Sequence, residues 1–323
     1  MTRMMTVSLA MLPYLPPEEP DRLQKTLDRM GVLIDQAAEL GSDLVAFPEM
    51  CTTDGAANPW QFEPLDGPSL AAAAQKARQR GIYVVCPLLT LEDGLRYNSA
   101  VLLGRDGKLA GHYHKVFPTH GELDQGILPG TETPVFETDR GRLGLAICFD
   151  LNYWEVGAGL CAAGAELVLW PSMWEGARHL TRWAIEFGFA MGAVYTQHAM
   201  FVDLVGRALA SLKRASADRT GSAPLLSATL DLDRRLLHHD FNLERLPALF
   251  QKYGATAAYA EHISQECLLV FGSRLPNKTS DELIAEFGLE PMRDYLARAL
   301  RDRKLVLEGK YRPSQREETK NER

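Results

Sequence analysis

The sequence predicts an α/β fold in which strands of mixed direction carry helices on both faces. Short apolar runs typical of buried strands alternate with longer segments in which apolar residues recur at helical spacing. Glycine or proline follows most of these runs, and composition does not change before about residue 272. Helices that alternate with strands pack as layers around one core, so a single domain is the simplest layout.

The first half of the chain supplies these elements in turn. A helix is predicted over 21–40, because Leu23, Leu27 and Met30 recur at helical spacing before Gly41. An alanine-rich helix is predicted over 69–80. Strands are predicted at 7–12, 43–47, 82–86, 97–103 and 108–114, with a hairpin-type turn at 105–107.

The second half continues the pattern after a loop rich in glycine, proline and polar residues at 117–130. Strands are predicted at 134–138, 143–147, 166–170, 195–205, 208–212 and 225–232, and helices at 153–163 and 180–191. Helical spacing returns over 280–305, and 314–323 has no apolar residue. We therefore expect a main domain at 1–275, a helical extension at 276–313 and a disordered tail at 314–323.

Composition excludes several classes of protein. The 323 residues carry a formal net charge of −7, which argues against nucleic acid as a partner. No apolar run approaches the roughly 18 residues that span a bilayer, and the first residues do not resemble a signal peptide. The five cysteines are scattered and form no C-x-x-C pair, so reduced thiols are expected. A cytoplasmic protein without a membrane partner is predicted.

One stretch suggests chemistry. Residues 144–150 read GLAICFD, so an apolar strand leads directly to Cys148 and then to a polar turn. A thiol at the end of a buried strand is held rigidly, and cysteine is the side chain most nucleophilic near neutral pH. The alternative is that Cys148 is a small core residue, as most free cysteines are.

Two charged residues also follow strands. Glu49 comes after the strand at 43–47, and Lys115 comes after the strand at 108–114. Ligands of open α/β sheets bind outside the carboxyl ends of the strands. If the three groups meet, Glu49 can take the thiol proton, while Lys115 and the N–H of Phe149 stabilise an oxyanion. The alternative is that both charges are solvated at strand ends.

These residues resemble the nitrilase, or carbon–nitrogen hydrolase, superfamily. The resemblance rests on the order and spacing of FPEM at 47–50, HKVF at 114–117 and GLAICFD at 144–150, with support from LPG at 128–130, WPSMW at 170–174 and HLTRWAIE at 179–186. It covers roughly residues 5–272.

The resemblance implies an α-β-β-α sandwich that dimerises so that its layers stack. It also implies Glu49 as base, Lys115 as oxyanion stabiliser and Cys148 as nucleophile, without metal or cofactor. A second glutamate of the family positions substrate and water, and Glu122 matches it here. A homodimer or higher homo-oligomer acting on a small molecule is expected.

Histidines and tryptophans near these motifs have simpler interpretations. His112 and His114 alternate along a strand and His120 follows, but no local carboxylate or thiolate clearly completes a metal site. Tryptophans are more often core residues than ligand contacts. Trp174 is the exception, because it follows the strand end at Pro171 on the expected cleft side, and we expect it to contact substrate.

The residues that follow Cys148 indicate the class of substrate. Nitrile-cleaving relatives typically carry Trp-Glu after the cysteine, whereas this chain has FDLNYW at 149–154. No cation lies in that run to hold the carboxylate of an N-carbamoyl amino acid, although Arg178 could do so. An amidase acting on a small linear amide is favoured. A carbamoylase, a nitrilase, an acyltransferase and a non-catalytic binding protein remain alternatives, and the sequence does not identify the substrate.

Overall fold

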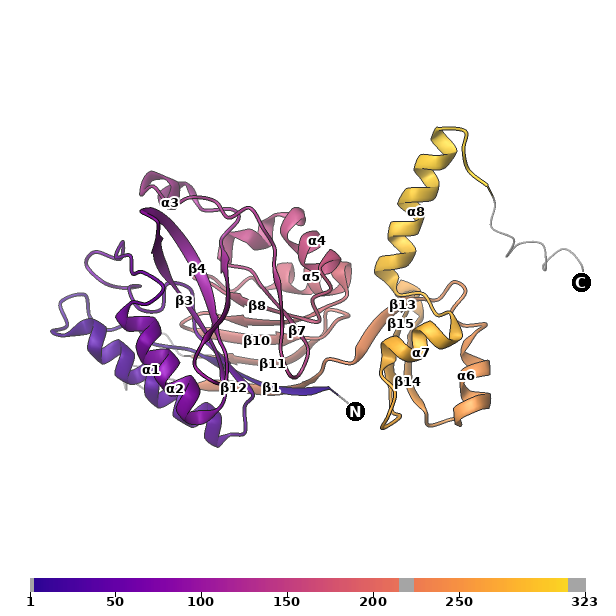
Figure 1. Ribbon diagram of the computed structural model, residues 1–323, viewed down its shortest axis with the longest axis horizontal. Helices are drawn as coiled ribbons and strands as arrows, with labels where there is room; N and C mark the ends of the chain where they lie inside the picture. The colour runs from indigo at the N-terminus through magenta and orange to yellow at the C-terminus, as the bar shows by residue number, and fades with distance from the viewer. Residues whose placement is uncertain (1–2, 215–223, 313–323) are drawn as a thin grey trace, which may run out of the picture. The chain divides into compact units, whose positions relative to one another are not determined.

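The structure, a computed structural model, describes residues 3–214 and 224–312 (Figure 1). The chain divides into two compact units between Arg234 and Arg235. The first unit contains two six-stranded sheets. The tail predicted at 314–323 lies outside the described residues.

The first sheet has the order β12-β1-β2-β3-β4-β5. Its strands are β12 (Leu225–Asp231), β1 (Met4–Ala10), β2 (Leu44–Ala46), β3 (Tyr83–Glu92), β4 (Leu95–Leu103) and β5 (Leu109–His114). The central strands β1, β2 and β3 are parallel, and the outer pairs are antiparallel. Helices α1 (Arg22–Glu39) and α2 (Pro68–Arg80) cover its outer face through apolar residues such as Leu33 and Ala77 (Figure 1).

The second sheet has the order β11-β10-β9-β8-β7-β6. Its strands are β11 (Ala208–Lys213), β10 (His198–Val202), β9 (Ala190–Val194), β8 (Leu167–Pro171), β7 (Arg142–Leu145) and β6 (Val135–Glu137). Strands β7, β8 and β9 run parallel. Helices α4 (Trp154–Ala162) and α5 (Arg178–Phe187) pack on its outer face around Trp183 and Leu160.

The main core lies between the two sheets. Leu9 and Tyr113 of the first sheet belong to one buried cluster with Leu145, Leu169 and Phe201 of the second. The layers therefore follow the order helix, sheet, sheet, helix. The α-β-β-α sandwich predicted from the sequence is confirmed for the first unit.

Four predicted elements differ from the structure. The strand expected at 195–205 is limited to β10, His198–Val202. The helix expected at 180–191 ends at Phe187, because Gly188 takes a left-handed conformation with φ of 70° and strand β9 begins at Ala190. The loop expected at 117–130 contains a short helix, α3 (His120–Asp124). The helix expected over 280–305 is two helices, α7 (Ser280–Phe287) and α8 (Met292–Leu307), separated by Gly288 and Pro291.

The second unit has its own small core. Its sheet has the order β13-β15-β14, formed by β13 (Arg234–His238), β15 (Leu268–Ser273) and β14 (Ala258–Ile263). Leu237, Leu249 of α6 (Leu246–Tyr253), Phe271 and Leu283 form its buried cluster. A 3-10 turn, η2 (Ser264–Glu266), precedes β15. The chain thus divides at residue 234, whereas the sequence predicts a boundary at 275. Within the described ranges, no helix is both long and apolar enough to cross a bilayer.

Candidate active site

The structure brings together the charged residues that the sequence places at separate strand ends. The Lys115 Nζ atom donates hydrogen bonds to Glu49 Oε1 and to Glu122 Oε2, each at 2.8 Å. All three side chains are buried, with Lys115 only 1% exposed. Glu49 follows β2, Lys115 follows β5, and Glu122 lies in α3. Three segments distant in sequence therefore meet around one ammonium group.

The two carboxylate oxygens of Glu49 have different surroundings. Oε1 accepts hydrogen bonds from Lys115 Nζ and from Asn98 Nδ2, both at 2.8 Å. Oε2 is buried, and no described residue gives it a hydrogen bond. One oxygen therefore fixes the side chain, and the other is available to accept a proton.

Asn98 is a site residue that the sequence analysis missed. It lies in β4, is fully buried, and donates to Glu122 Oε1 at 2.5 Å as well as to Glu49. Its amide therefore bridges two carboxylates that would otherwise repel each other. The available signal was an adjacent polar pair, Asn98 and Ser99, inside an otherwise apolar strand.

Glu122 is held by its own helix as well as by Lys115. Thr119 caps α3, and its backbone N–H donates to Glu122 Oε2 at 2.7 Å. Burial raises the pKa of Glu122, but the nearby Lys115 charge and the hydrogen bonds from Lys115 and Asn98 outweigh it, so the pKa is lowered overall. Glu122 is therefore a carboxylate near neutral pH.

Lys115 is a cation for the complementary reason. Burial alone lowers the pKa of an ammonium group, but the charges of Glu49 and Glu122 and the hydrogen bond to Glu122 act against burial, and the pKa of Lys115 is raised. A fixed positive charge thus stays at the buried centre of the site, where an oxyanion can form against it.

Cys148 begins the 3-10 turn η1 (Cys148–Asn152) just beyond β7. Its backbone is left-handed, with φ of 45°, and its carbonyl accepts a hydrogen bond from Trp170 Nε1 at 3.0 Å. Burial raises the pKa of the Cys148 thiol to about 12; the Glu49 charge adds to this and the Lys115 charge opposes it. The resting thiol is therefore protonated and needs a base before it can attack.

Asp150 ties the Cys148 turn to the segment that carries Lys115. It is fully buried and accepts hydrogen bonds from the N–H groups of Ile147 at 2.9 Å and Phe117 at 2.8 Å, and from the Tyr113 hydroxyl at 2.7 Å. Burial raises its pKa to about 7, although these donors favour the charged form. Asp150 fixes the relative position of the two segments.

The two predicted substrate contacts lie beside the turn. Phe149 follows Cys148 directly, and its ring meets Tyr153 edge-on at a centroid distance of 5.4 Å. Trp174 is half-buried between Trp170 and His179, at 5.5 and 5.7 Å. The backbone N–H of Trp174 donates to Ser172 Oγ at 3.0 Å. Their contact with substrate stays a prediction.

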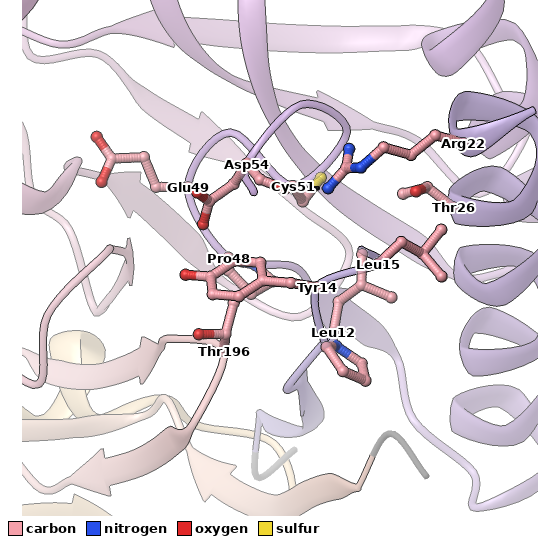
Figure 2. A pocket seen from close by; sticks show the side chains of 11 residues that line it. Leu12, Tyr14, Leu15, Arg22, Thr26, Pro48, Glu49, Cys51, Asp54 and Thr196 are labelled. Carbon is pink, nitrogen blue, oxygen red and sulfur yellow. Dashed lines mark hydrogen bonds between the residues drawn. The ribbon is translucent and has the colours of Figure 1, made fainter. Parts of the chain in front are cut away.

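Glu49 also contributes to the lining of a pocket. Figure 2 shows Tyr14, Asp54 and Thr196 around it, with Arg22 of α1 reaching in from the side of the helices. The Arg22 guanidinium donates to the Asp54 carbonyl. Asp54 Oδ2 and Thr196 Oγ1 are buried, and the Tyr14 side chain is the polar neighbour of both residues.

Comparison with known proteins defines the class of protein. The family model for carbon-nitrogen hydrolases matches residues 9–235, which contain every site residue described above. The chain belongs to the carbon–nitrogen hydrolase family.

The similar curated proteins include several amidases. The chain is 28% identical over 158 residues to the omega-amidase NIT2 of Xenopus tropicalis, covering 46% of this chain and 57% of that protein. It is 31% identical over 183 residues to the deaminated glutathione amidase of Rattus norvegicus, covering 50% and 55%. A hydrolase of Mycobacterium tuberculosis, Rv0480c, is 30% identical over 168 residues, covering 49% and 60%. The matches thus span little more than half the length of these relatives.

Solved structures share the fold. An amidase from Nesterenkonia sp. superposes with a TM-score of 0.59 at 22% identity, covering 77% of this chain and 96% of that one. Nit3 of Saccharomyces cerevisiae gives 0.58 at 18% identity, covering 78% and 95%. At this identity, the likeness supports the sandwich architecture.

Proposed function

We propose that this protein hydrolyses the carbon–nitrogen bond of a small linear amide through a thioester on Cys148. The observation that carries the proposal is the asymmetry of Glu49. Lys115 and Asn98 hold its Oε1, while its buried Oε2 accepts no hydrogen bond from the described chain. Its charge acts on the Cys148 thiol. A base, a cation and a protonated thiol are what cysteine-dependent acyl transfer requires.

In the first half of the reaction, Glu49 takes the thiol proton as the Cys148 sulfur attacks the amide carbon. The carbonyl oxygen becomes an oxyanion, stabilised by Lys115 Nζ and the Phe149 N–H. Protonated Glu49 then gives its proton to the amide nitrogen. The C–N bond breaks, ammonia leaves, and the acyl group remains on sulfur.

In the second half, Glu49 deprotonates a water molecule that attacks the thioester carbon. The C–S bond breaks, the carboxylic acid leaves, and the thiolate recovers a proton from Glu49. Glu122 and Asn98 keep Lys115 and Glu49 in position through both halves, because their hydrogen bonds do not involve the atoms that react.

An amide substrate is favoured over the alternatives. The residues after Cys148 lack the Trp-Glu pair of nitrile-cleaving relatives. Arg178, the cation considered for a carbamoyl amino acid, is exposed at the start of α5. The similar proteins are themselves named as amidases. A cytoplasmic location remains a prediction.

A substrate panel tests the proposal. Short-chain amides, nitriles and N-carbamoyl amino acids are incubated with the full chain, and ammonia release is measured together with the intact mass of the protein. We expect ammonia from amides and an acyl adduct on Cys148, both lost in Cys148→Ala and kept in the control Cys161→Ala. Unchanged amide hydrolysis in Cys148→Ala overturns the mechanism. Added hydroxylamine intercepts the thioester as a hydroxamate, which tests whether the acyl-enzyme forms.

A further inference from the structure

Three potential metal ligands converge on the outer face of the first sheet. Glu92 ends β3, and His112 and His114 alternate along β5. His112 Nε2 lies 3.5 Å from Glu92 Oε2, and His114 Nε2 lies 3.6 Å from Glu92 Oε1. Within residues 3–214 and 224–312, these are the three side chains that could share one ion, with all ligand atoms within 4.8 Å of one another.

This cluster faces away from the candidate active site. In the register of β4 and β5, Ser99 pairs with His114 and Val101 pairs with His112. Alternate residues of a strand point to opposite faces, so Asn98 and Lys115 point the other way. The carboxylate of Glu92 belongs to β3 and reaches the two histidines of β5 across the intervening strand β4.

The distances suit ligands around an ion better than a direct hydrogen bond. Two atoms at 3.5 and 3.6 Å are beyond ordinary N–H···O contact. Nitrogen and oxygen ligands bound to a tetrahedral zinc ion at their usual bond lengths lie about 3.3 Å apart. The three side chains are 21% to 29% exposed, so an ion can enter from solvent.

The donor and acceptor roles of Thr90 and Ser99 fix the tautomer of His114. Thr90 Oγ1 donates to Glu92 Oε1 at 2.9 Å. Its only proton is thereby used, so Ser99 Oγ must donate in the 2.6 Å bond between the two hydroxyls. Ser99 must then accept from His114 Nδ1 at 2.9 Å. A neutral His114 therefore presents the lone pair of Nε2 to the Glu92 carboxylate.

A lone pair that faces a carboxylate needs a cation between them. A proton on His114 is one solution, but 3.6 Å is long for the N–H···O hydrogen bond that it would make to Glu92. A metal ion is the other. The Nδ1–H···Ser99 contact is the outer hydrogen bond that metal-bound histidines commonly make. Tyr97 stacks on the His114 ring at 4.0 Å and restricts its rotation.

We propose that Glu92, His112 and His114 bind one divalent transition-metal ion, with Zn²⁺ as the best-suited ion and water completing the coordination. Two imidazoles and one carboxylate are a ligand set that zinc accepts. The ion would join β3 to β5 on the face opposite the reacting groups. It takes no part in amide cleavage and stabilises the sheet edge from which Lys115 extends.

Cobalt and zinc titrations of the full chain, stripped with chelator, test the site. We expect one equivalent of Co²⁺ to give visible d–d bands without a thiolate charge-transfer band, because no sulfur is among the ligands. His114→Ala and Glu92→Gln should each weaken Zn²⁺ binding at least tenfold by calorimetry. Ser99→Ala should weaken it about tenfold through the lost outer contact. The matched control is His262→Ala, which removes half of the His239–His262 pair of the second unit.

Melting curves of the stripped variants show whether each one folds. Absence of Zn²⁺ binding at micromolar concentration by the folded wild-type chain overturns the proposal. A Co²⁺ spectrum with a thiolate band that disappears in Cys148→Ala also overturns it, because the ion then sits at the nucleophile. Equal Zn²⁺ affinity in folded wild-type and His114→Ala proteins contradicts it as well.

Discussion

At the scale of single residues, the Glu49 charge has two opposite effects on Cys148. In the proposed mechanism Glu49 is the base that removes the thiol proton, yet its negative charge also raises the pKa of that thiol. The charge of Lys115 lowers the pKa of the Cys148 thiol. In this mechanism the thiolate therefore forms only as the proton moves to Glu49.

Glu49→Gln separates these two effects. Loss of the base should lower amide hydrolysis at least about a hundredfold. Loss of the negative charge should lower the Cys148 pKa, so alkylation by iodoacetamide should be retained or accelerated. Peptide mapping after partial labelling measures this, with the exposed Cys267 as the internal reference. Amide hydrolysis at the wild-type rate in Glu49→Gln would contradict the assignment of Glu49 as base.

Lys115→Ala should reduce both rate and stability. Removal of an oxyanion donor costs on the order of a hundredfold in kcat, with a smaller change in KM. Two buried carboxylates then lack their cation, which destabilises the fold by on the order of 3 kcal/mol. Kinetics and thermal unfolding measure the two effects, with the exposed Lys108→Ala as control. A folded, fully active Lys115→Ala protein rules out the proposed role.

Glu122→Gln tests positioning. An amide at this place would turn its N–H₂ group either toward Lys115 and the Thr119 N–H or toward Asn98 Nδ2. All three are donors, so the hydrogen bonds around the ammonium should shift in either case. A displacement of about 1 Å costs on the order of a hundredfold in rate. Single-turnover assays should show slowed ammonia release in Glu122→Gln. The exposed control Asp124→Asn should keep the wild-type melting temperature. Release at the wild-type rate would remove Glu122 from the site.

Glu49, Lys115 and Cys148 could be proposed from the sequence because each follows a recognisable strand and because the motifs around them resemble one family. Asn98 could not be predicted, because a buried amide in the middle of a strand differs from any other polar residue only through its neighbours in space. The same holds for Glu92, which joins His112 and His114 only through the pairing of three strands.

At the scale of elements, local signals placed most helices and strands but not their breaks. Apolar residues continue from the end of helix α5 into strand β9, and the helix ends where Gly188 takes a left-handed conformation. Helical spacing likewise continues across Gly288 and Pro291, where the backbone changes direction between α7 and α8. Periodicity reports which residues are buried, whereas a single residue decides where an element ends.

One carboxylate links two helices of the second unit. Glu286 of α7 accepts from Lys252 of α6 and from Lys278 at 2.6 and 2.7 Å, and from the Tyr253 hydroxyl at 2.8 Å. The hydrogen bonds from Lys252, Lys278 and Tyr253 lower its pKa to about 2. A depressed carboxyl pKa stabilises the fold above the unfolded value of about 4.3, and this contribution is lost as pH falls toward 2.

Hydrogen exchange as a function of pH tests this link. Amides of α6 and α7 should lose protection between about pH 5 and pH 2, after correction for the intrinsic rate. In Glu286→Gln, protection should be lower near pH 7 and should change less over that range. An identical pH dependence in both proteins would show that the contact does not stabilise the unit.

At the scale of the whole molecule, the sequence did not reveal that the chain divides after Arg234. Strands β13, β14 and β15 have the same apolar character as those of the sandwich, and no linker separates them. Which strands pair decides the boundary, and pairing is not visible in composition.

We predict that the protein is a homo-oligomer whose contacts include α8. None of the residues of α8 is buried, and Leu296, Leu300 and Leu307 share one face while 43%, 69% and 71% exposed. An apolar stripe of this kind favours a partner. Removal of 292–323, which spares the core residue Leu283, or Leu300→Glu should lower the mass measured by light scattering. Arg301→Glu, on another face, is the control. A monomeric full chain contradicts the prediction.

Strands β4 and β5 place consecutive residues on opposite faces of the sheet. Asn98 and Lys115 face the reacting groups, and their chain neighbours Ser99 and His114 face the proposed ion. If the bound ion changes the free energy of substrate binding, bound substrate must change the free energy of ion binding by the same amount. If Zn²⁺ tightens substrate binding by a given factor, substrate must tighten Zn²⁺ binding by the same factor. Ion binding on one face and substrate binding on the other would then be thermodynamically coupled through strands β4 and β5.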